Sequence, residues 1–145
     1  MTHMQIRTAH APEPGNYSQA RAVDLGSYLA VYIAGQTGND PITDNVVEGG
    51  IGPQTTQALA NIQGILEAVG GRLEHIVDMT VFLENMARDK KDFEAAYVTS
   101  MPKPLPARAL VEVTHVPLLS EDTVVELKAI AYVPKKRNTI SSSSN

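Results

Sequence analysis

The sequence contains no cysteine and no tryptophan, and its aromatic residues are five tyrosines and two phenylalanines. Without cysteine there are no disulfides, thiolate metal ligands, iron–sulfur ligands or cysteine nucleophiles. The chain also lacks the run of about 18 apolar residues that a membrane span needs, and its first residues have no apolar secretory core. We therefore expect a cytoplasmic protein that does not span a membrane.

Basic residues are scarce, since 12 Lys and Arg stand against 16 Asp and Glu and the formal net charge is -4. Nucleic-acid surfaces normally carry a basic stripe or aromatic stacking platforms, so this composition argues against a nucleic-acid partner. The 145 residues, 43% of them hydrophobic, are enough for one domain with its own core. We expect that domain to span residues 1–133, and residues 134–145, which are polar and rich in serine, to form a disordered tail.

Apolar periodicity and turn residues predict the element order ββ-α-β-α-ββ. Strands are predicted over 17–25, 28–36, 76–83, 107–115 and 123–133, and helices over 53–69 and 88–101. Pro53 suits a first helical turn, and the glycines at 70–71 suit a helix end. In the strand 76–83, alternation places Val77, Met79, Val81 and Leu83 on one face. The pattern indicates an α+β protein with both helices on one face of a mixed sheet.

The last predicted strand has two apolar faces. One face carries Val125, Leu127, Ala129, Ala131 and Val133, and the other carries Val124, Glu126, Lys128, Ile130 and Tyr132. The helices can cover only one of these faces, so the other predicts contact with a second copy of the chain.

Neither a metal nor a cofactor is predicted. The four histidines, His3, His10, His75 and His115, lack the spacing that places two imidazoles on one metal. The glycine-rich segment 49–52 precedes a helix, but Pro53 removes an N–H donor there and no Lys-Ser/Thr pair follows, which disfavours phosphate binding.

Arg108 and Glu126 are the charged residues with the clearest chemical use, since each lies in a β-rich segment with few other charges. A guanidinium donates two parallel hydrogen bonds to a carboxylate, which makes Arg108 a candidate anchor for an acidic substrate. Burial among Val124, Val125 and Leu127 would raise the pKa of Glu126 toward the range in which it exchanges protons near neutral pH. The pattern equally allows an ion pair between the two at an interface, and it leaves Glu112 as a rival carboxylate.

Several motifs, taken in order, resemble the RidA family, which is also called YjgF or Rid. These are Ala11-Pro12, Gly15-Asn16-Tyr17-Ser18-Gln19-Ala20, Ile33-Ala34-Gly35-Gln36, Asp40-Pro41, Gln54-Thr55, Thr80-Val81-Phe82-Leu83, Pro106-Ala107-Arg108-Ala109-Leu110-Val111-Glu112-Val113 and Val125-Glu126-Leu127-Lys128-Ala129-Ile130-Ala131. The resemblance covers almost the whole chain except the tail.

The resemblance implies a chorismate-mutase-like fold, a homotrimer with ligand clefts between subunits, and an enamine/imine deaminase that converts a small 2-imino acid to a 2-keto acid and ammonia without a cofactor. It implies that Arg108 binds the substrate carboxylate and that Glu126 activates water. Tyr17 matches the family's pocket tyrosine, and Gly35 and Leu110 match positions whose backbone groups hold substrate or water.

Two positions depart from the family pattern. Ala34 stands where many members carry a serine, and Tyr97 stands near the position of a pocket asparagine. These departures point to a bulkier or less polar substrate than 2-aminoacrylate, such as an aminomuconate. The alternative from another functional class is a non-catalytic trimer that binds a small carboxylate, for which the resemblance also leaves room.

Overall fold

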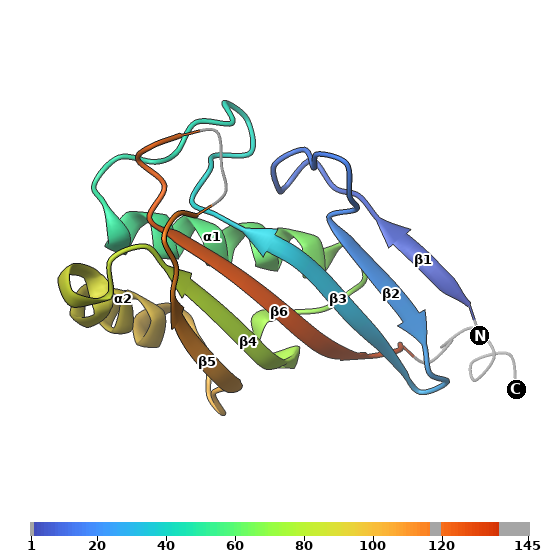
Figure 1. The fold of residues 1–145 in the computed structure, drawn as a ribbon. Coiled ribbons are helices and arrows are strands. Elements are labelled where there is room, and N and C mark those ends of the chain that lie inside the picture. Colours follow the sequence, from blue (N-terminus) through green and yellow to red (C-terminus); the bar gives the residue numbers. More distant parts are fainter. Residues whose placement is uncertain (1, 117–119, 137–145) are drawn as a thin grey trace, which may run out of the picture.

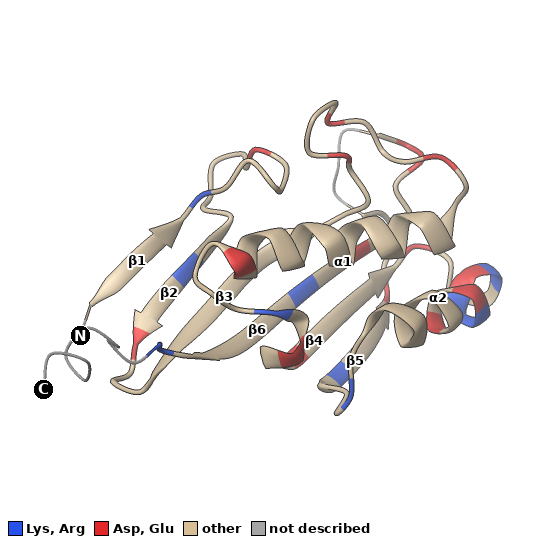
Figure 2. Cartoon of the chain, turned by 180° about the vertical axis from the view of Figure 1, so that it is seen from behind, with Lys and Arg blue, Asp and Glu red and all other residues tan. Residues whose placement is uncertain are grey.

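The computed structural model describes residues 2–116 and 120–136 (Figure 1). Six strands form one mixed sheet in the order β1-β2-β3-β6-β4-β5, in which β4 and β5 are parallel and the other neighbours antiparallel. The strands are β1 (His3–Ile6), β2 (Ala20–Asp24), β3 (Tyr28–Gln36), β4 (Ile76–Leu83), β5 (Ala107–Glu112) and β6 (Val125–Pro134). The helices are α1 (Ile51–Glu67), the short 3-10 helix η1 (Leu73–His75) and α2 (Met86–Ser100). The long helices lie side by side on one face of the sheet (Figure 2), which confirms the predicted α+β class and helix placement.

The hydrophobic core lies between the helices and the sheet. In β6, Val125, Leu127 and Val133 have no exposed surface, and Ile62 and Ile65 of α1 have none either. The alternating residues of β6 therefore divide between the two faces of the sheet as the pattern predicted. Burial of these aliphatic side chains, each worth about 1.5–3 kcal/mol, anchors α1 to the central strands.

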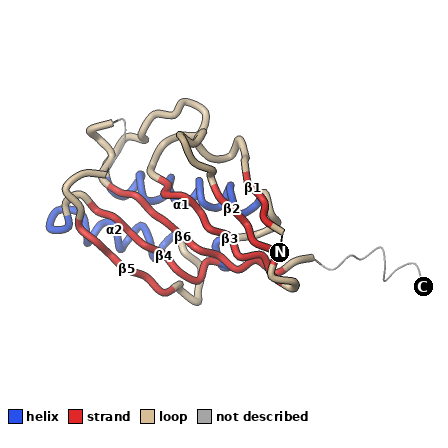
Figure 3. Tube along the Cα trace, turned by 45° about the vertical axis from the view of Figure 1, so that its right-hand side comes forward, coloured by secondary structure: helices blue, strands red, loops and turns tan. Residues whose placement is uncertain are grey.

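Neither helix covers the other face of the sheet, which is turned toward the viewer in Figure 3. This face carries large exposed side chains. Tyr28 and Tyr32 of β3 and Tyr132 of β6 are each nearly half exposed. We call this surface the open face of the sheet. Such a patch is typical of a protein–protein interface, and the homotrimer stays a prediction.

Most predicted boundaries lie within a few residues of the observed ones, and the strands 28–36 and 76–83 agree completely. The helix predicted from 53 begins at Ile51, since Gly50 at φ 81° turns the chain into the helix. The strand predicted to 115 ends at Glu112, and the one predicted from 123 begins at Val125. The strand β1 was not predicted, because its four residues are too few for their alternation to indicate a strand, and it forms by pairing with β2.

The predicted orientation of Val77 was wrong. A register shift between Ile76 and Asp78 interrupts the pairing of β4 with β6, and it leaves Val77 45% exposed. Ile76 takes the core position instead, at 4% exposure. A bulge of this kind adds one residue to a strand and reverses the alternation before it.

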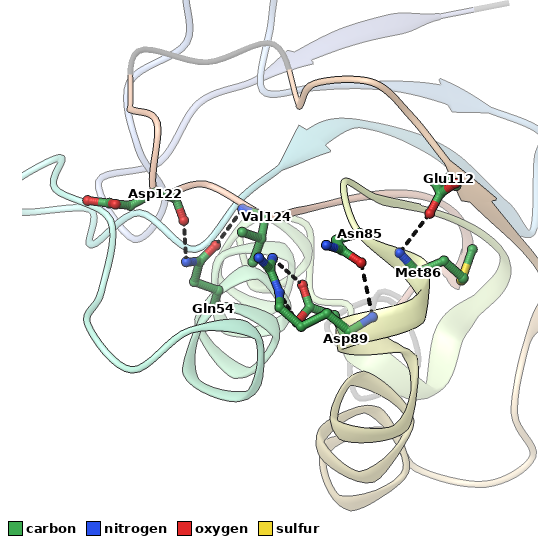
Figure 4. Close-up of polar contacts among 8 residues, drawn as sticks. Gln54, Asn85, Met86, Asp89, Glu112, Asp122 and Val124 are labelled. Carbon is green, nitrogen blue, oxygen red and sulfur yellow. Dashed lines mark hydrogen bonds and ion pairs between the residues drawn. The ribbon is translucent and has the colours of Figure 1, made fainter.

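The loop before β6 is tied to the start of α1 by Gln54, which is buried. Its Nε2 donates to the carbonyl of Asp122 at 2.7 Å, and its Oε1 accepts from the backbone N–H of Val124 at 3.0 Å (Figure 4). Gln54 therefore sets where β6 begins. Glu112, at the end of β5, accepts a hydrogen bond from the N–H of Met86 at 2.9 Å and so holds the first turn of α2.

The fold continues slightly into the predicted tail. β6 includes Pro134, and Lys135 donates from its Nζ to Asp24 at 2.8 Å and from its backbone to Ser27 at 3.0 Å. Residues 137–145 of the predicted tail lie outside the described residues. Within the described ranges, no helix has the length and apolar character needed to cross a bilayer.

Candidate functional site

A concave surface of about 970 Å³ opens beside the ends of β3 and β6. We call it the Glu126 cleft. Its lining includes Tyr17, Ala34, Gly35 and Glu126, four of the residues selected from the sequence, together with Lys128. Tyr17 is 56% exposed, so its ring is free to contact a bound molecule.

Gly35 places the Glu126 carboxyl against the β3 backbone. A Cβ atom at position 35 would lie 2.5 Å from Oε1 of Glu126 and 2.6 Å from its Cδ. No real Cβ contact is that short, so the observed position of Glu126 requires glycine at this site. The pairing of β3 with β6 is irregular between Ile33 and Gln36, and the two residues between them, Ala34 and Gly35, line the cleft.

Burial is the main cause of the altered acidity of Glu126. It raises the pKa of the Glu126 carboxyl above its ordinary value, and the positive charge of Lys128 opposes the shift. Lys128 itself donates to the Ile33 carbonyl at 3.4 Å. A carboxyl with a raised pKa exchanges protons closer to neutral pH than an exposed glutamate does, as was inferred from its apolar neighbours.

The wall of the cleft that bears Tyr17 is held by Gln19, whose side chain is 1% exposed. Its Nε2 donates to the carbonyls of Thr8, Ala11 and Pro12, and its Oε1 accepts from the Thr8 N–H at 2.7 Å. The backbone of Gln19 also accepts a hydrogen bond from Ala34. One buried amide thus ties the N-terminal loop to the strand that carries Ala34 and Gly35.

A second buried amide holds the opposite wall. Asn61 of α1 has no exposed surface, and its Nδ2 donates to the carbonyls of Thr37 at 3.1 Å and Asn39 at 2.9 Å. The Asn61 Oδ1 accepts from Gln57 at 2.9 Å. Both amides are buried polar groups with several partners, which is the arrangement that fixes a loop in one position.

Arg108 lies in a different pocket, of about 520 Å³, between β5 and α2. We call it the Arg108 pocket. Nη1 and Nη2 of Arg108 donate to the two carboxylate oxygens of Glu94 at 2.6 and 2.8 Å. The guanidinium also lies 4.8 Å from the ring centre of Tyr97 and 5.5 Å from that of Phe93. Glu94 therefore neutralises the charge of Arg108, and the rings of Phe93 and Tyr97 make cation–π contacts with the guanidinium.

The pairing of strands places Arg108 and Glu126 on opposite faces of the sheet. Arg108 pairs with Met79, which is fully buried in the core, so the Arg108 side chain lies on the helix face. Glu126 pairs with Phe82, three positions from Met79 along β4, and so lies on the open face. Within one chain the two groups therefore form no ion pair.

The other selected residues divide between these two places. Tyr97 is 3% exposed and lines the Arg108 pocket. Leu110, two residues after Arg108 on the same face, packs against the core. Glu112 binds the start of α2 and lies outside the Glu126 cleft. No three His, Asp or Glu side chains in the described part of the chain are grouped closely enough to hold a metal ion.

Glu94 was not identified from the sequence. The only local signal is its place on α2 next to Phe93 and one turn before Tyr97, which puts it over the rings that support Arg108. That arrangement depends on how α2 packs across β5, and sequence periodicity does not specify it.

Comparison with known proteins agrees with this architecture. The sequence matches the profile of the family described as Endoribonuclease L-PSP over residues 8–133. A RutC family protein of Pyrococcus horikoshii is 41% identical over 128 residues, which cover 88% of this chain and 95% of that protein. A 2-iminobutanoate/2-iminopropanoate deaminase of Mus musculus is 39% identical over 127 residues, 87% of this chain and 88% of that protein.

The crystal structure of RidA from the Antarctic bacterium Psychrobacter sp. PAMC 21119 superimposes with a TM-score of 0.78. It shares 38% sequence identity and covers 90% of this chain and 99% of its own. The six-stranded sheet with two helices on one face defines the class of protein to which these relatives belong. The chain belongs to the Endoribonuclease L-PSP family, also known as the YjgF/RidA family.

Proposed function

We propose that the protein is an enamine/imine deaminase, which hydrolyses 2-enamino and 2-imino acids to 2-keto acids and ammonia. The observation that carries this proposal is the Glu126 carboxyl, whose pKa burial raises, at the wall of a cleft with Tyr17 and Gly35. The name of the mouse relative is that of a 2-imino acid deaminase. The family match over residues 8–133 includes both the cleft and the pocket.

The proposed reaction needs a positioned water molecule and one proton-exchanging group. An enamine first tautomerises to the imine, whose carbon is electrophilic. Glu126 as carboxylate takes a proton from water as the oxygen attacks this carbon, and a tetrahedral carbinolamine forms. Attack on the protonated imine leaves an amine, and the resulting carboxylic acid returns its proton to this nitrogen, which becomes an ammonium. The Glu126 carboxylate then takes the hydroxyl proton as the C=O bond forms and the C–N bond breaks, and this proton leaves with ammonia as ammonium. A carboxyl with a raised pKa suits these proton transfers near neutral pH.

The carboxylate anchor and the proton-exchanging group must meet in one cleft for this reaction. Because Arg108 and Glu126 lie on opposite faces of the sheet in one chain, we propose that the Arg108 pocket of one copy closes over the Glu126 cleft of the next. Exposed apolar residues at the rim of the Arg108 pocket, Val98 and Leu105, support contact with another surface there. The homotrimer with clefts between subunits fits this requirement.

The lining of the cleft also bears on which substrate is accepted. Ala34 presents no hydroxyl to the Glu126 cleft, and the Tyr97 ring fills space beneath Arg108. Both features favour a substrate with an apolar side chain over the small, polar 2-aminoacrylate.

Ribonuclease activity, which the family description names, has less support. The Glu126 cleft contains Glu13, Asp44 and Glu126 against a single Lys128. Acidic and basic residues are also mixed along α2 (Figure 2), so that helix offers no basic stripe to a phosphate backbone.

The direct test measures imine hydrolysis. An amino-acid oxidase generates 2-imino acids, or a dehydratase generates 2-aminoacrylate, and loss of the imine is followed with and without the protein. We expect the wild type to accelerate hydrolysis and Arg108→Ala to lower kcat/KM by about 100-fold, because the substrate carboxylate loses its charged partner. No acceleration by the wild type with small and bulky substrates would overturn the proposal and favour the carboxylate-binding alternative.

A further inference from the structure

The Arg108 guanidinium is already bound to a carboxylate within its own chain. Glu94 accepts from Nη1 and Nη2 together, at 2.6 and 2.8 Å, so it occupies the end of the fork where a ligand carboxylate would bind in parallel. The Arg108 side chain is 21% exposed and that of Glu94 is 39% exposed, so the pair faces the pocket opening. A ligand therefore meets an ion pair with no net charge.

Arg108 keeps donors for a ligand despite this pair. A guanidinium has five N–H donors, and Glu94 uses two of them. A bare carboxylate at the remaining edge would lie beside the Glu94 carboxylate, and the repulsion would weaken binding. A ligand with a protonated nitrogen next to its carboxylate would instead donate to Glu94 while its carboxylate accepts from Arg108.

The charge state of Glu94 suits this role. Its hydrogen bonds with Arg108 lower the pKa of the Glu94 carboxyl, so it stays ionised at neutral pH and remains a hydrogen-bond acceptor. Tyr97, which lines the same pocket, keeps its hydroxyl buried and its ring centre 4.8 Å from the guanidinium. The pocket thus presents donors and an acceptor within one small volume.

We propose that Glu94 makes the Arg108 pocket selective for zwitterionic ligands, 2-amino or 2-iminio acids, over bare carboxylates and dicarboxylates. This inference rests on the proposed function and specifies its substrate class. It also separates substrate from product, because hydrolysis replaces the nitrogen with a carbonyl oxygen and the 2-keto acid loses the group that Glu94 binds. An aminomuconate, which carries two carboxylates, is a poor fit.

The test compares two non-reacting ligands with the same carbon chain, 2-aminobutanoate and butanoate. Their dissociation constants are measured by calorimetry for the wild type, Glu94→Gln, Arg108→Ala and Glu74→Gln. Glu74 is the matched control, because it forms an exposed ion pair with Arg72 at an N–O distance of 2.7 Å. Neither residue lines the Arg108 pocket. Thermal unfolding of each variant shows that it is folded.

We expect the wild type to bind 2-aminobutanoate about tenfold more tightly than butanoate, since one charge-assisted hydrogen bond is gained and one repulsion avoided. Glu94→Gln should remove this preference and bind butanoate about tenfold more tightly than the wild type does, whereas Glu74→Gln should behave as the wild type. Arg108→Ala should bind neither ligand.

Three results would overturn the inference: an unchanged preference in Glu94→Gln, weaker butanoate binding in that variant, or no binding of either ligand to the wild type. Weaker butanoate binding would mean that Glu94 only orients Arg108. Imine hydrolysis is measured in parallel. A preference for the zwitterion without turnover would refute the deaminase activity and support the proposed ligand class. Turnover without such a preference would support the deaminase activity and refute the ligand class.

Discussion

Arg108 and Glu126 project from opposite faces of the same sheet. Arg108 pairs with the buried Met79 and stacks on Tyr97 of α2, whereas Glu126 pairs with Phe82 on the side away from the helices. A single chain therefore separates the proposed carboxylate anchor from the proposed proton-exchanging group. If both act on one substrate, they come from two copies, and catalysis depends on assembly.

The first prediction concerns that assembly. We expect light scattering to report a trimer, and Tyr132→Glu on the open face to produce monomers, because a buried carboxylate without a partner opposes association. Imine hydrolysis should then fall by about 100-fold or more, since the two halves of the site no longer meet. Far-UV circular dichroism should be unchanged, because the core lies on the other face of β6.

The control for this experiment is Ile42→Glu, at a loop residue that is 90% exposed. It adds the same charge and should leave both mass and activity unaltered. A wild-type protein that is monomeric and fully active would disprove the arrangement of half-sites.

The second prediction concerns Glu126 as the proton-exchanging group. Glu126→Gln keeps the shape of the side chain and removes its acid–base function, so kcat should fall by about 100- to 10,000-fold. The dissociation constant of 2-aminobutanoate should change by less than about twofold, because Arg108 and Glu94 are intact. Equal losses of turnover and binding would assign Glu126 to ligand binding instead.

The third prediction follows from the raised pKa of the Glu126 carboxyl. Below its ordinary pKa of 4.5 the carboxyl is protonated in both folded and unfolded chains. As pH rises through the higher folded pKa, ionisation in the buried site costs free energy, and the stabilisation present at low pH is lost. Glu126→Gln lacks this cost. Its unfolding temperature should match the wild type near pH 4 and exceed it at pH 8, and the opposite trend would contradict the burial argument.

Much of the fold was predictable because its central elements carry strong patterns. β3 begins with a run of apolar residues and β4 is rich in β-branched residues, and the strands 28–36 and 76–83 were predicted to the residue. The alternation in β6 correctly separated Leu127 from Glu126. β1 and the outward turn of Val77 were missed, since an edge pairing and a bulge are set by the neighbouring strand.

The site was predictable in its parts and less so in its arrangement. Tyr17, Ala34, Gly35 and Glu126 share one cleft. The separation of Arg108 from Glu126 follows from the parallel pairing of β5 with β4, a contact between distant segments. Glu94 contacts Arg108 because of how α2 is placed relative to β5. The apolar periodicity of α2 cannot predict a contact with a distant strand.

The fourth prediction tests the close approach of β3 to Glu126. Gly35→Ala would place a Cβ atom 2.5 Å from Oε1 of Glu126, and the end of that flexible side chain would move to relieve the overlap. We expect the protein to fold and kcat to fall by about 100-fold, because a shift of about 1 Å misplaces the carboxyl. Gly52→Ala, where a Cβ atom would meet nothing within 4 Å, should retain full activity. Wild-type turnover in Gly35→Ala would show that the position of Glu126 is unimportant.

The fifth prediction asks whether one buried amide holds the Tyr17 wall. Gln19→Ala removes four hydrogen bonds and leaves the Thr8 N–H and three carbonyls without these partners. The free energy of unfolding should therefore fall by about 2–4 kcal/mol. Urea unfolding at a single protein concentration measures this, with Gln63→Ala as control. Among the described residues the Gln63 amide bonds only to Glu67, on the exposed side of α1.

The control should cost less than about 0.5 kcal/mol. Turnover separates stability from positioning, because a folded Gln19→Ala protein with a loosened loop should show a raised KM as Tyr17 loses its fixed place in the Glu126 cleft. Equal unfolding free energies for the two variants would mean that the loop is held by its backbone alone. The buried Gln19 side chain would then need another explanation.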